Sequence, residues 1–441
     1  MKHSADPRVP PFHPARREFL AGAAALAGAG VLGSCSTIGG QRRAPAPRGK
    51  PFTPLGPGET IRMGVIGTGG MGSEHARSIC RQIQAGVEKV QIVAVSDVAL
   101  TRMERCAKEC SESQKIEVAQ YQYYKDLLAR DDIHGVLIAS PEHWHAPMAI
   151  DAILAGKDVY CEKPMTYDLD DAVRLMDAVH ANSQILQVGT QYVMLPKYAE
   201  ARKQIAAGVL GKPLWSQTSY CRNTPSGEWN YYGIEEDVIP GQTLDWEEWC
   251  RPLGPAKWDP LVYFRWRRYS KYSTGIIGDL LVHMMTPLIW AIDAGWPIRI
   301  DAVGGHYVDK EMDNFDQVNL TIQFDSAHTM IVAGATNNET GLEVMVRGNK
   351  ANMLLGGNNV VVRPERPYEE DVDPFEVACE GIDDQPSLRA NWWQCMRTRE
   401  PNKSPVDLGF KVMVIVDLAH RSMWDGHAYA FDPATLTAKR V

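Results

Sequence analysis

The sequence predicts an α/β protein whose first folded part is a doubly wound parallel sheet. Three observations support this prediction. Short β-rich runs alternate with helical segments between residues 61 and 189. The first of these runs stops at a glycine-rich turn, residues 67–72, that opens a helix. Polar residues follow several of the predicted strands, at the edge where such sheets bind their ligands.

The first 59 residues are expected to lie outside the folded domains. Residues 1–35 contain the pair Arg16 and Arg17, then Phe-Leu and a short run of small apolar residues, which is typical of a twin-arginine export signal. A frayed N-terminal helix is the alternative. Residues 36–59 have the Pro- and Gly-rich composition of an extended linker.

The N-terminal segment predicts a periplasmic or otherwise exported protein. The sequence Leu-Gly-Ser-Cys ending at Cys35 also resembles a lipobox, so a lipid anchor at this cysteine and a membrane-anchored lipoprotein stay open as alternatives.

The composition excludes several classes of partner. The chain has 441 residues and a formal net charge of -8, which argues against nucleic acid as a partner. The nine cysteines include no Cys-x-x-Cys pair, and no other metal-ligand pattern is present in the sequence, so we expect no metal.

The first predicted strand, Ile61–Ile66, leads into the pattern Gly-x-Gly-x-x-Gly. Gly67 permits the tight turn, Gly69 allows the backbone to approach a pyrophosphate, and Gly72 lets the following helix, Ser73–Gln84, pack closely on the strand. Phosphates bind at the N-terminus of such a helix. The pattern indicates a dinucleotide-binding Rossmann domain.

A second strand, residues 90–96, ends at an acidic residue. Asp97 follows Gly72 by 25 residues, close to the position of a carboxylate that binds the adenosine ribose. Its charge should repel a 2′-phosphate, which favours NAD over NADP. Arg102 lies near enough in sequence to weaken this preference.

The alternation then continues to residue 189. Predicted strands and helices follow one another as strand 135–139, helix 143–155, strand 157–161, helix 169–181 and strand 185–189. The polar groups just past strand ends are residues 140–145, residues 162–164 and residues 190–192. These side chains are expected to meet at one edge of the sheet.

The pattern as a whole resembles the Gfo/Idh/MocA oxidoreductases, the relatives of glucose-fructose oxidoreductase and inositol dehydrogenase. The resemblance runs from about residue 60 to the C-terminus, and its most specific part is the segment Ala155–Pro164 with its Glu-Lys-Pro ending. It implies a second α/β domain, built on an open, mostly antiparallel sheet that often forms oligomer contacts. A homo-oligomer is therefore expected.

The family's catalytic groups fall on Lys163, Asp279 and His283. A four-residue spacing would place Asp279 and His283 on one face of a helix. We expect His283 to act as general base, Lys163 to hold and stabilise the substrate oxygen, and Asp279 to bind a substrate hydroxyl or to orient His283. The family often has three glycines before the Asp, whereas this chain has Gly275-Ile-Ile-Gly278.

The motif and the resemblance together also assign the contacts to the two ligands. Cofactor contacts are expected from Gly67, Gly69, Gly70, Met71, Gly72, Asp97, Ser140, Pro141, His145, Glu162, Lys163 and Gln191. Substrate contacts are expected from Trp144, Tyr192, Arg267, Tyr272 and Asp279. A solvated basic loop is the alternative for the segment around Arg267.

The second half of the chain predicts the remaining elements. Strands are expected within residues 317–363, and closing helices over residues 386–399 and 407–424. The predicted domains are therefore a Rossmann domain over residues 60–190, a substrate and oligomerisation domain over residues 191–400, and a C-terminal helix and tail over residues 401–441 that returns to the Rossmann domain.

The function predicted from these features is NAD-dependent oxidation of a secondary hydroxyl in a sugar, cyclitol or related polyol. The alternative is a redox glycosidase, in which tightly bound NAD supports oxidation, elimination and hydration of a glycoside. Lys163 favours the dehydrogenase, because a glycosidase branch of the family often lacks this lysine. A non-catalytic ligand-binding protein is the third hypothesis.

Overall fold

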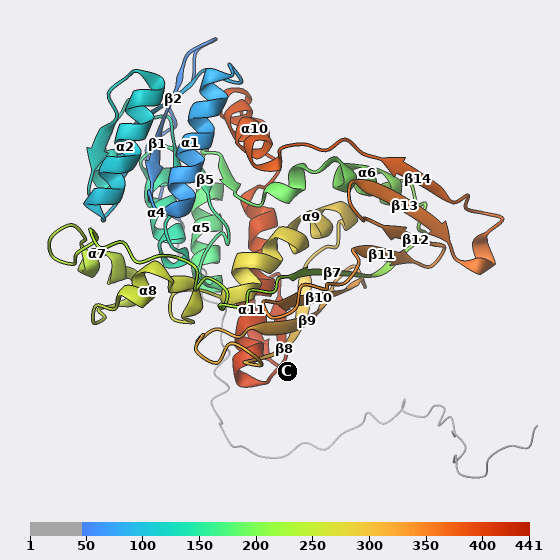
Figure 1. Ribbon diagram of the computed structural model, residues 1–441. Helices are drawn as coiled ribbons and strands as arrows, with labels where there is room; N and C mark the ends of the chain where they lie inside the picture. The colour runs from blue at the N-terminus through green and yellow to red at the C-terminus, as the bar shows by residue number, and fades with distance from the viewer. Residues whose placement is uncertain (1–45) are drawn as a thin grey trace, which may run out of the picture. The chain divides into compact units, whose positions relative to one another are not determined.

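The structure is a computed structural model that describes residues 46–441. The predicted export signal, Cys35 and the first ten residues of the predicted linker lie outside the described residues. Within residues 46–441, no helix is both long and apolar enough to cross a membrane. The described chain contains two sheets, and helices cover both faces of the first one (Figure 1).

The first sheet is the predicted Rossmann sheet. Its strands are all parallel and lie in the order β3-β2-β1-β4-β5-β6. The strands are β1 (Ile61–Ile66), β2 (Val90–Ser96), β3 (Ala119–Tyr121), β4 (Gly135–Ile138), β5 (Asp158–Cys161) and β6 (Leu186–Val188). The helices between them are α1 (Gly70–Gln84), α2 (Leu100–Gln114), α3 (Tyr124–Leu128), α4 (Glu142–Leu154) and α5 (Leu169–Ala181). The order reverses between β1 and β4, which is where ligands of doubly wound sheets bind.

The glycine turn between β1 and α1 has the close contacts that the motif requires. Gly67 has a φ of +83°, and a Cβ on Gly72 would lie 1.8 Å from the carbonyl oxygen of Gly67. The backbone N–H and the hydroxyl of Thr68 both donate to the Asp97 carboxylate. The turn and the end of β2 are thereby joined.

The second sheet has ten strands in the order β14-β13-β12-β11-β7-β10-β9-β8-β15-β16. Among its described pairs, β7 and β10 are parallel and the others are antiparallel, which confirms the predicted open, mostly antiparallel sheet. The strands are β7 (Pro213–Cys221), β8 (Pro297–Gly305), β9 (Gln317–Phe324), β10 (Thr329–Ala335), β11 (Met345–Gly348), β12 (Ala351–Leu354), β13 (Asn359–Pro364), β14 (Phe375–Ala378), β15 (Tyr429–Asp432) and β16 (Thr437–Arg440). Residues of β9 alternate between buried and exposed, so one face of the sheet is packed and the other is open.

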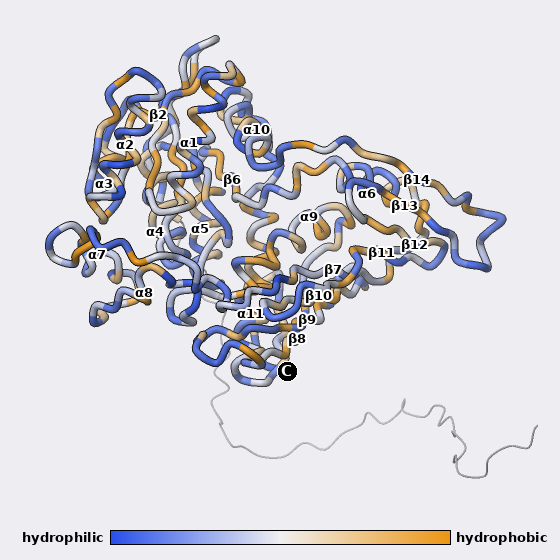
Figure 2. Tube along the Cα trace, in the orientation of Figure 1, coloured by the Kyte–Doolittle hydropathy of each residue, from blue (hydrophilic) through white to orange (hydrophobic). Residues whose placement is uncertain are grey.

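Helices join the two sheets. α11 (Val406–Asp425) contacts both α5 and β8, and α9 (Val282–Ile292), which is hydrophobic along most of its length, packs beside it (Figure 2). α6 (Pro196–Ala206) packs on α9. α10 (Asp384–Thr398) packs on the Rossmann domain, since a Cβ on Gly135 would meet the side chains of Trp392 and Met396. The final strands β15 and β16 extend the ten-stranded sheet.

Residues 222–275, which follow β7, form a segment that we call the aromatic insert. It contains the short helices α7 (Trp246–Cys250) and α8 (Pro260–Phe264), which lie near one end of the Rossmann domain (Figure 1). Its large side chains form a second hydrophobic cluster together with Ala99 of the Rossmann domain. Backbone hydrogen bonds from Leu100 to Thr243 and from Asp245 to Val98 fix the insert beside the end of β2.

The glycine turn yields a prediction about stability. Gly72→Ala is expected to lower the free energy of unfolding by about 2 to 3 kcal/mol, because the added methyl group overlaps a backbone carbonyl that cannot move without disturbing the turn. The matched control is Gly70→Ala, whose Cβ would meet nothing within 4 Å. The control should be neutral or slightly stabilising, because alanine favours the helix. Denaturant unfolding of both variants checks this, and equal stabilities would contradict it.

Candidate active site

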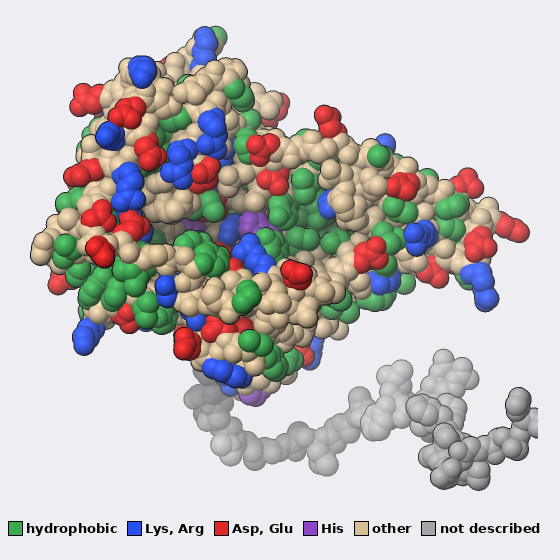
Figure 3. Space-filling model, viewed as in Figure 1, with side chains coloured by type: hydrophobic (Ala, Val, Ile, Leu, Met, Phe, Trp, Pro, Cys, Tyr) green, Lys and Arg blue, Asp and Glu red, His purple; other side chains and the backbone are tan. Residues whose placement is uncertain are grey.

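Two neighbouring cavities lie where the Rossmann domain, the aromatic insert and the second sheet meet. The larger, of about 530 Å³, lies over the glycine turn and is called the nucleotide cavity. The smaller, of about 230 Å³, is called the polar cavity. Met71, Tyr232 and Arg267 line both. Figure 3 shows a hollow on this side of the molecule in which basic and histidine side chains gather.

The nucleotide cavity fits a dinucleotide. Many of the predicted cofactor residues line it, namely Gly67, Gly69, Gly70, Met71, Asp97, Ser140 and Pro141. The Cβ position of Gly70 faces open space, which leaves room for a ligand against the backbone at the N-terminus of α1. Gly72 acts inside the turn through its close contact with Gly67.

Other predicted cofactor residues lie elsewhere. Both ring nitrogens of the buried His145 lie at hydrogen-bond distance from backbone carbonyls, those of Ser140 and Pro164, so this side chain joins two strand-end segments without lining either cavity. Glu162 and Gln191 line the polar cavity.

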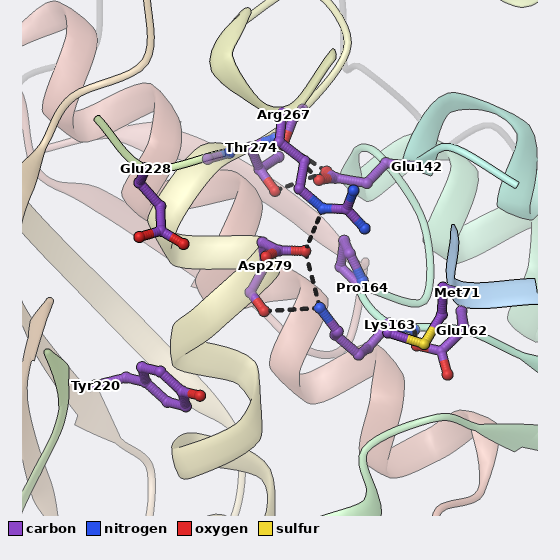
Figure 4. Close-up of polar contacts among 12 residues, drawn as sticks. Met71, Glu142, Glu162, Lys163, Pro164, Tyr220, Glu228, Arg267, Thr274 and Asp279 are labelled. Carbon is purple, nitrogen blue, oxygen red and sulfur yellow. Dashed lines mark hydrogen bonds and ion pairs between the residues drawn. The ribbon is translucent and has the colours of Figure 1, made fainter. Parts of the chain in front are cut away.

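Lys163, Asp279 and Arg267 form a buried charge cluster in the polar cavity (Figure 4). The Lys163 Nζ donates to the Asp279 Oδ1 at 2.8 Å and to the Asp279 carbonyl at 2.9 Å. The Arg267 Nε donates to the same Oδ1 at 2.8 Å. Burial alone would raise the pKa of Asp279, but the two cations hold it well below its usual range. Asp279 is therefore ionised and keeps Lys163 in place.

Asp279 does not lie where α-helical spacing predicts. Ile277–Leu281 is a π-helical turn that precedes α9, and this wider turn directs the Asp279 carboxylate toward Lys163. No hydrogen bond among the described residues joins Asp279 to His283. Asp279 therefore does not orient His283 through a hydrogen bond. Its carboxylate bonds Lys163 and Arg267 instead.

His283 lines the polar cavity between two tyrosine rings. Its ring centroid lies 5.4 Å from that of Tyr192 and 6.1 Å from that of Tyr220. Burial, together with the nearby Lys163 charge, lowers the pKa of His283 to about 3. Its buried Nδ1 has no hydrogen-bond partner among residues 46–441. The imidazole is therefore neutral and has an unused nitrogen.

Two of the predicted substrate residues lie outside the polar cavity. Trp144 lines the nucleotide cavity, and its indole N–H donates to the carbonyl of Trp249 at 2.9 Å. Tyr272 is buried against Trp249 and His143 and lines neither cavity. The predicted substrate contacts that do line the polar cavity are Tyr192, Arg267 and Asp279.

Sequence reasoning missed several lining residues of the polar cavity. They are Tyr220, Arg222, Trp229, Tyr231 and Gln385. Arg222 donates to the Tyr220 hydroxyl at 2.9 Å and to the buried Glu228 carboxylate at 2.8 Å. Because Tyr220 and Arg222 mark the end of β7, recognising that strand would have singled them out.

Glu162 is positioned by a buried chain of hydrogen bonds. Arg389 of α10 bonds the His75 Nδ1 at 2.8 Å, and the His75 Nε2 bonds Glu162 at 2.7 Å. An arginine only donates, so the proton of a neutral His75 must lie on Nε2 and point at Glu162. Although burial opposes ionisation, His75 and Lys163 lower the pKa of Glu162 to about 2.

Comparisons with known proteins place this arrangement in a family. Residues 61–190 match the model "Oxidoreductase family, NAD-binding Rossmann fold", and residues 254–431 match "Oxidoreductase family, C-terminal alpha/beta domain". The fold and the site thus define an oxidoreductase with an NAD-binding Rossmann domain. The chain belongs to the Gfo/Idh/MocA family.

Named relatives are inositol dehydrogenases. The chain is 33% identical to the inositol 2-dehydrogenase of Gluconacetobacter diazotrophicus over 247 residues, covering 55% of this chain and 66% of the relative. It is 36% identical to inositol 2-dehydrogenase 4 of Saccharopolyspora erythraea over 155 residues, covering 35% of this chain and 43% of the relative. The chain thus spans between two fifths and two thirds of these relatives.

Solved structures share the fold. Levoglucosan dehydrogenase in complex with NADH has a TM-score of 0.65 and 18% identity, over 84% of this chain and 98% of that one. An aldose-aldose oxidoreductase from Caulobacter crescentus has a TM-score of 0.63 and 16% identity, over 84% and 99%. At these identities the likeness shows the fold alone.

A third carboxylate, Glu142 at the start of α4, joins the end of the aromatic insert to the Rossmann domain. It accepts hydrogen bonds from the Ser273 hydroxyl at 2.5 Å and from the N–H and hydroxyl of Thr274, both at 2.9 Å. Burial raises the pKa of Glu142 to about 7 despite these donors. Near neutral pH the side chain is therefore partly protonated.

Glu142 makes stability depend on pH. Its folded-state pKa of about 7 lies above the ordinary value of 4.5, so the folded chain holds this proton more tightly than the unfolded chain. The resulting contribution, up to about 3 kcal/mol, is fully present below pH 4.5 and is lost as the pH rises through 7.

Glu142→Gln should therefore flatten the fall in unfolding free energy between about pH 5 and 7, since glutamine carries no titrating proton. Denaturant unfolding at several pH values measures this slope. Glu339→Gln, on an exposed loop, is the control and should keep the slope of the parent protein. An unchanged slope in Glu142→Gln would show that burial does not raise the pKa of Glu142.

Proposed function

We propose that the protein oxidises a secondary hydroxyl of a sugar, cyclitol or related polyol, with NAD as hydride acceptor. The observation that carries this proposal is the position of Lys163 and His283 in a polar cavity that adjoins the nucleotide cavity. The names of the relatives, inositol 2-dehydrogenases, support the substrate class.

The residues that would hold NAD are present. The glycine turn would bind the pyrophosphate through backbone N–H groups, and Asp97 would accept hydrogen bonds from the adenosine ribose hydroxyls. When bound, NAD would supply the carbon that accepts hydride. Met71, Arg267 and Tyr232 line both cavities, so they would lie between NAD and the substrate.

Two side chains of the polar cavity would act on the reacting hydroxyl group in different ways. Lys163, held by Asp279, would donate a hydrogen bond to the reacting hydroxyl oxygen and stabilise the negative charge that develops there. The neutral His283 would accept the hydroxyl proton. The ionised Asp279 and Glu162 favour a positive charge on His283, but burial and the Lys163 charge outweigh them and keep its pKa at about 3.

The lining of the polar cavity also suits a polyol. Tyr192, Tyr231 and Gln191 offer groups that both donate and accept hydrogen bonds, as hydroxyl groups require. The Trp229 side chain adds an apolar surface of the kind that packs on sugar rings. Arg222 and Arg267 add donors near their carboxylate partners.

Substitution of the two central residues tests the proposal. Lys163→Met and His283→Asn should each lower kcat by about 10²- to 10⁴-fold, because each removes a group that acts on the reacting hydroxyl. NAD binding, measured by calorimetry, should persist. His328→Gln is the control, because His328 is also buried but bonds Ser216 in the second sheet, outside both cavities.

The assay is NADH formation over a panel of cyclitols, sugars and aryl glycosides. Undiminished turnover in Lys163→Met and His283→Asn would overturn the assigned roles. Release of aglycone without net NADH would replace the dehydrogenase by a redox glycosidase.

We also propose that the protein is exported by the twin-arginine route. The support is the sequence of residues 1–35, with Arg16 and Arg17 before a short apolar run. Replacing both arginines by lysine should retain the full-length protein in the cytoplasm of a bacterial host, as followed by fractionation. Equal export of both forms would refute the proposal, and mass spectrometry of exported protein would show whether Cys35 carries lipid.

A further inference from the structure

The aromatic insert places a carboxylate at the ribose end of the nucleotide cavity. Glu235 lines this cavity together with Asp97 and Arg102. The Arg102 Nη2 donates to the Glu235 Oε1 at 2.6 Å. Arg102 belongs to α2 and Glu235 to the insert, so the pair joins the Rossmann domain to the insert at the cavity wall.

Arg102 is held on several sides. Its guanidinium lies 5.1 Å from the ring centroid of Tyr263 and 5.0 Å from that of Phe264, and its side chain is only 16% exposed. A Cβ on Gly69 would lie 3.4 Å from its Nη1, so the guanidinium also borders the glycine turn. The aromatic rings and Glu235 together fix its orientation.

The presence of Arg102 near Asp97 does not by itself decide between NAD and NADP. An arginine close to the ribose-binding acid is the group that accommodates a 2′-phosphate in NADP-dependent Rossmann domains, and it binds such a phosphate through two parallel hydrogen bonds. Asp97 alone repels the phosphate, whereas an unpaired Arg102 would attract it. The charge of Arg102 therefore decides the outcome.

Glu235 neutralises that charge. We propose that Glu235 is a specificity-determining residue, which excludes NADP by occupying the Arg102 guanidinium and by adding a second negative charge beside Asp97. This inference rests on NAD binding and is independent of the substrate.

The other arginines of the nucleotide cavity also support the exclusion of NADP. The arginines that line the nucleotide cavity are Arg77, Arg102 and Arg267, and each bonds a carboxylate within the described chain. Arg105, outside the cavity, also contacts Glu235 at 3.2 Å but is exposed and shared with Asp237. Within the described part of the chain, no arginine that lines this cavity is thus left unpaired for a 2′-phosphate.

The position of Glu235 is fixed by its own segment. The insert pairs with the backbone just after Asp97, through the hydrogen bonds between Leu100 and Thr243 and between Asp245 and Val98. These bonds hold the insert against the residues that follow β2. Glu235 is therefore presented to Arg102 by an anchored segment.

Calorimetric titration of the purified full chain with NAD⁺ and with NADP⁺ tests the proposal. Glu235→Gln should lower the Kd for NADP⁺ at least about tenfold relative to that for NAD⁺, because it removes the charge that neutralises Arg102 while keeping the shape of the side chain. Asp237→Asn is the matched control and should leave the ratio of the two Kd values unchanged, since Asp237 contacts only the exposed Arg105 among these arginines.

The double variant Arg102→Met/Glu235→Gln separates charge release from a general loosening of the insert. If Arg102 is the phosphate ligand, the gain in NADP⁺ affinity should disappear in this variant. A ratio in Glu235→Gln within twofold of the parent, or a gain that persists in the double variant, would overturn the proposal. Circular dichroism of each variant establishes that it is folded.

Discussion

The active site depends on one shared carboxylate. Asp279 accepts hydrogen bonds from Lys163 of the Rossmann domain and from Arg267 of the aromatic insert, while its own backbone belongs to the π-helical turn before α9. A buried carboxylate is stable only when its charge is compensated, so these segments must meet for any of them to be correctly placed. Removing either cation would leave the buried Asp279 charge with a single cationic partner, which is expected to destabilise the folded chain. The electrostatic requirement thereby fixes the geometry in which Lys163 faces the polar cavity.

The other two buried carboxylates show how environment separates groups of the same chemistry. Glu162 accepts a hydrogen bond from His75 and also feels the positive charge of Lys163, so its pKa falls to about 2. Glu142 receives only neutral donors, and burial raises its pKa to about 7. Desolvation therefore outweighs the hydrogen bonds at Glu142, whereas the His75 hydrogen bond and the Lys163 charge together outweigh it at Glu162. Glu162 therefore contributes a negative charge to the polar cavity. Glu142 has a structural role, because it joins the aromatic insert to α4.

Much of the fold follows from the sequence, and less of the site does. The alternation of strands and helices and the tight contact of Gly67 with Gly72 are local properties, so periodicity and glycine spacing predict them. The π-helical turn was not predictable from spacing, because Asp279 turns toward Lys163 for a tertiary reason. The sequence does not reveal that Tyr272 packs in a core and that Trp144 lines the nucleotide cavity, because an aromatic residue near a site motif packs in a core as readily as it lines a cavity. The Glu235 pairing joins residues 133 positions apart, which local patterns do not reveal.

The aromatic insert connects the two ends of the site. Its Glu235 reaches the ribose end of the nucleotide cavity, and its Arg267 lines both cavities beside Asp279. Its last residues are tied to Glu142, and its middle is tied to the backbone after β2. These bonds hold the insert against the Rossmann domain at both places. The segment that places a carboxylate at the ribose end of the nucleotide cavity therefore also supplies the arginine that compensates the Asp279 charge beside Lys163, because a buried carboxylate needs such compensation.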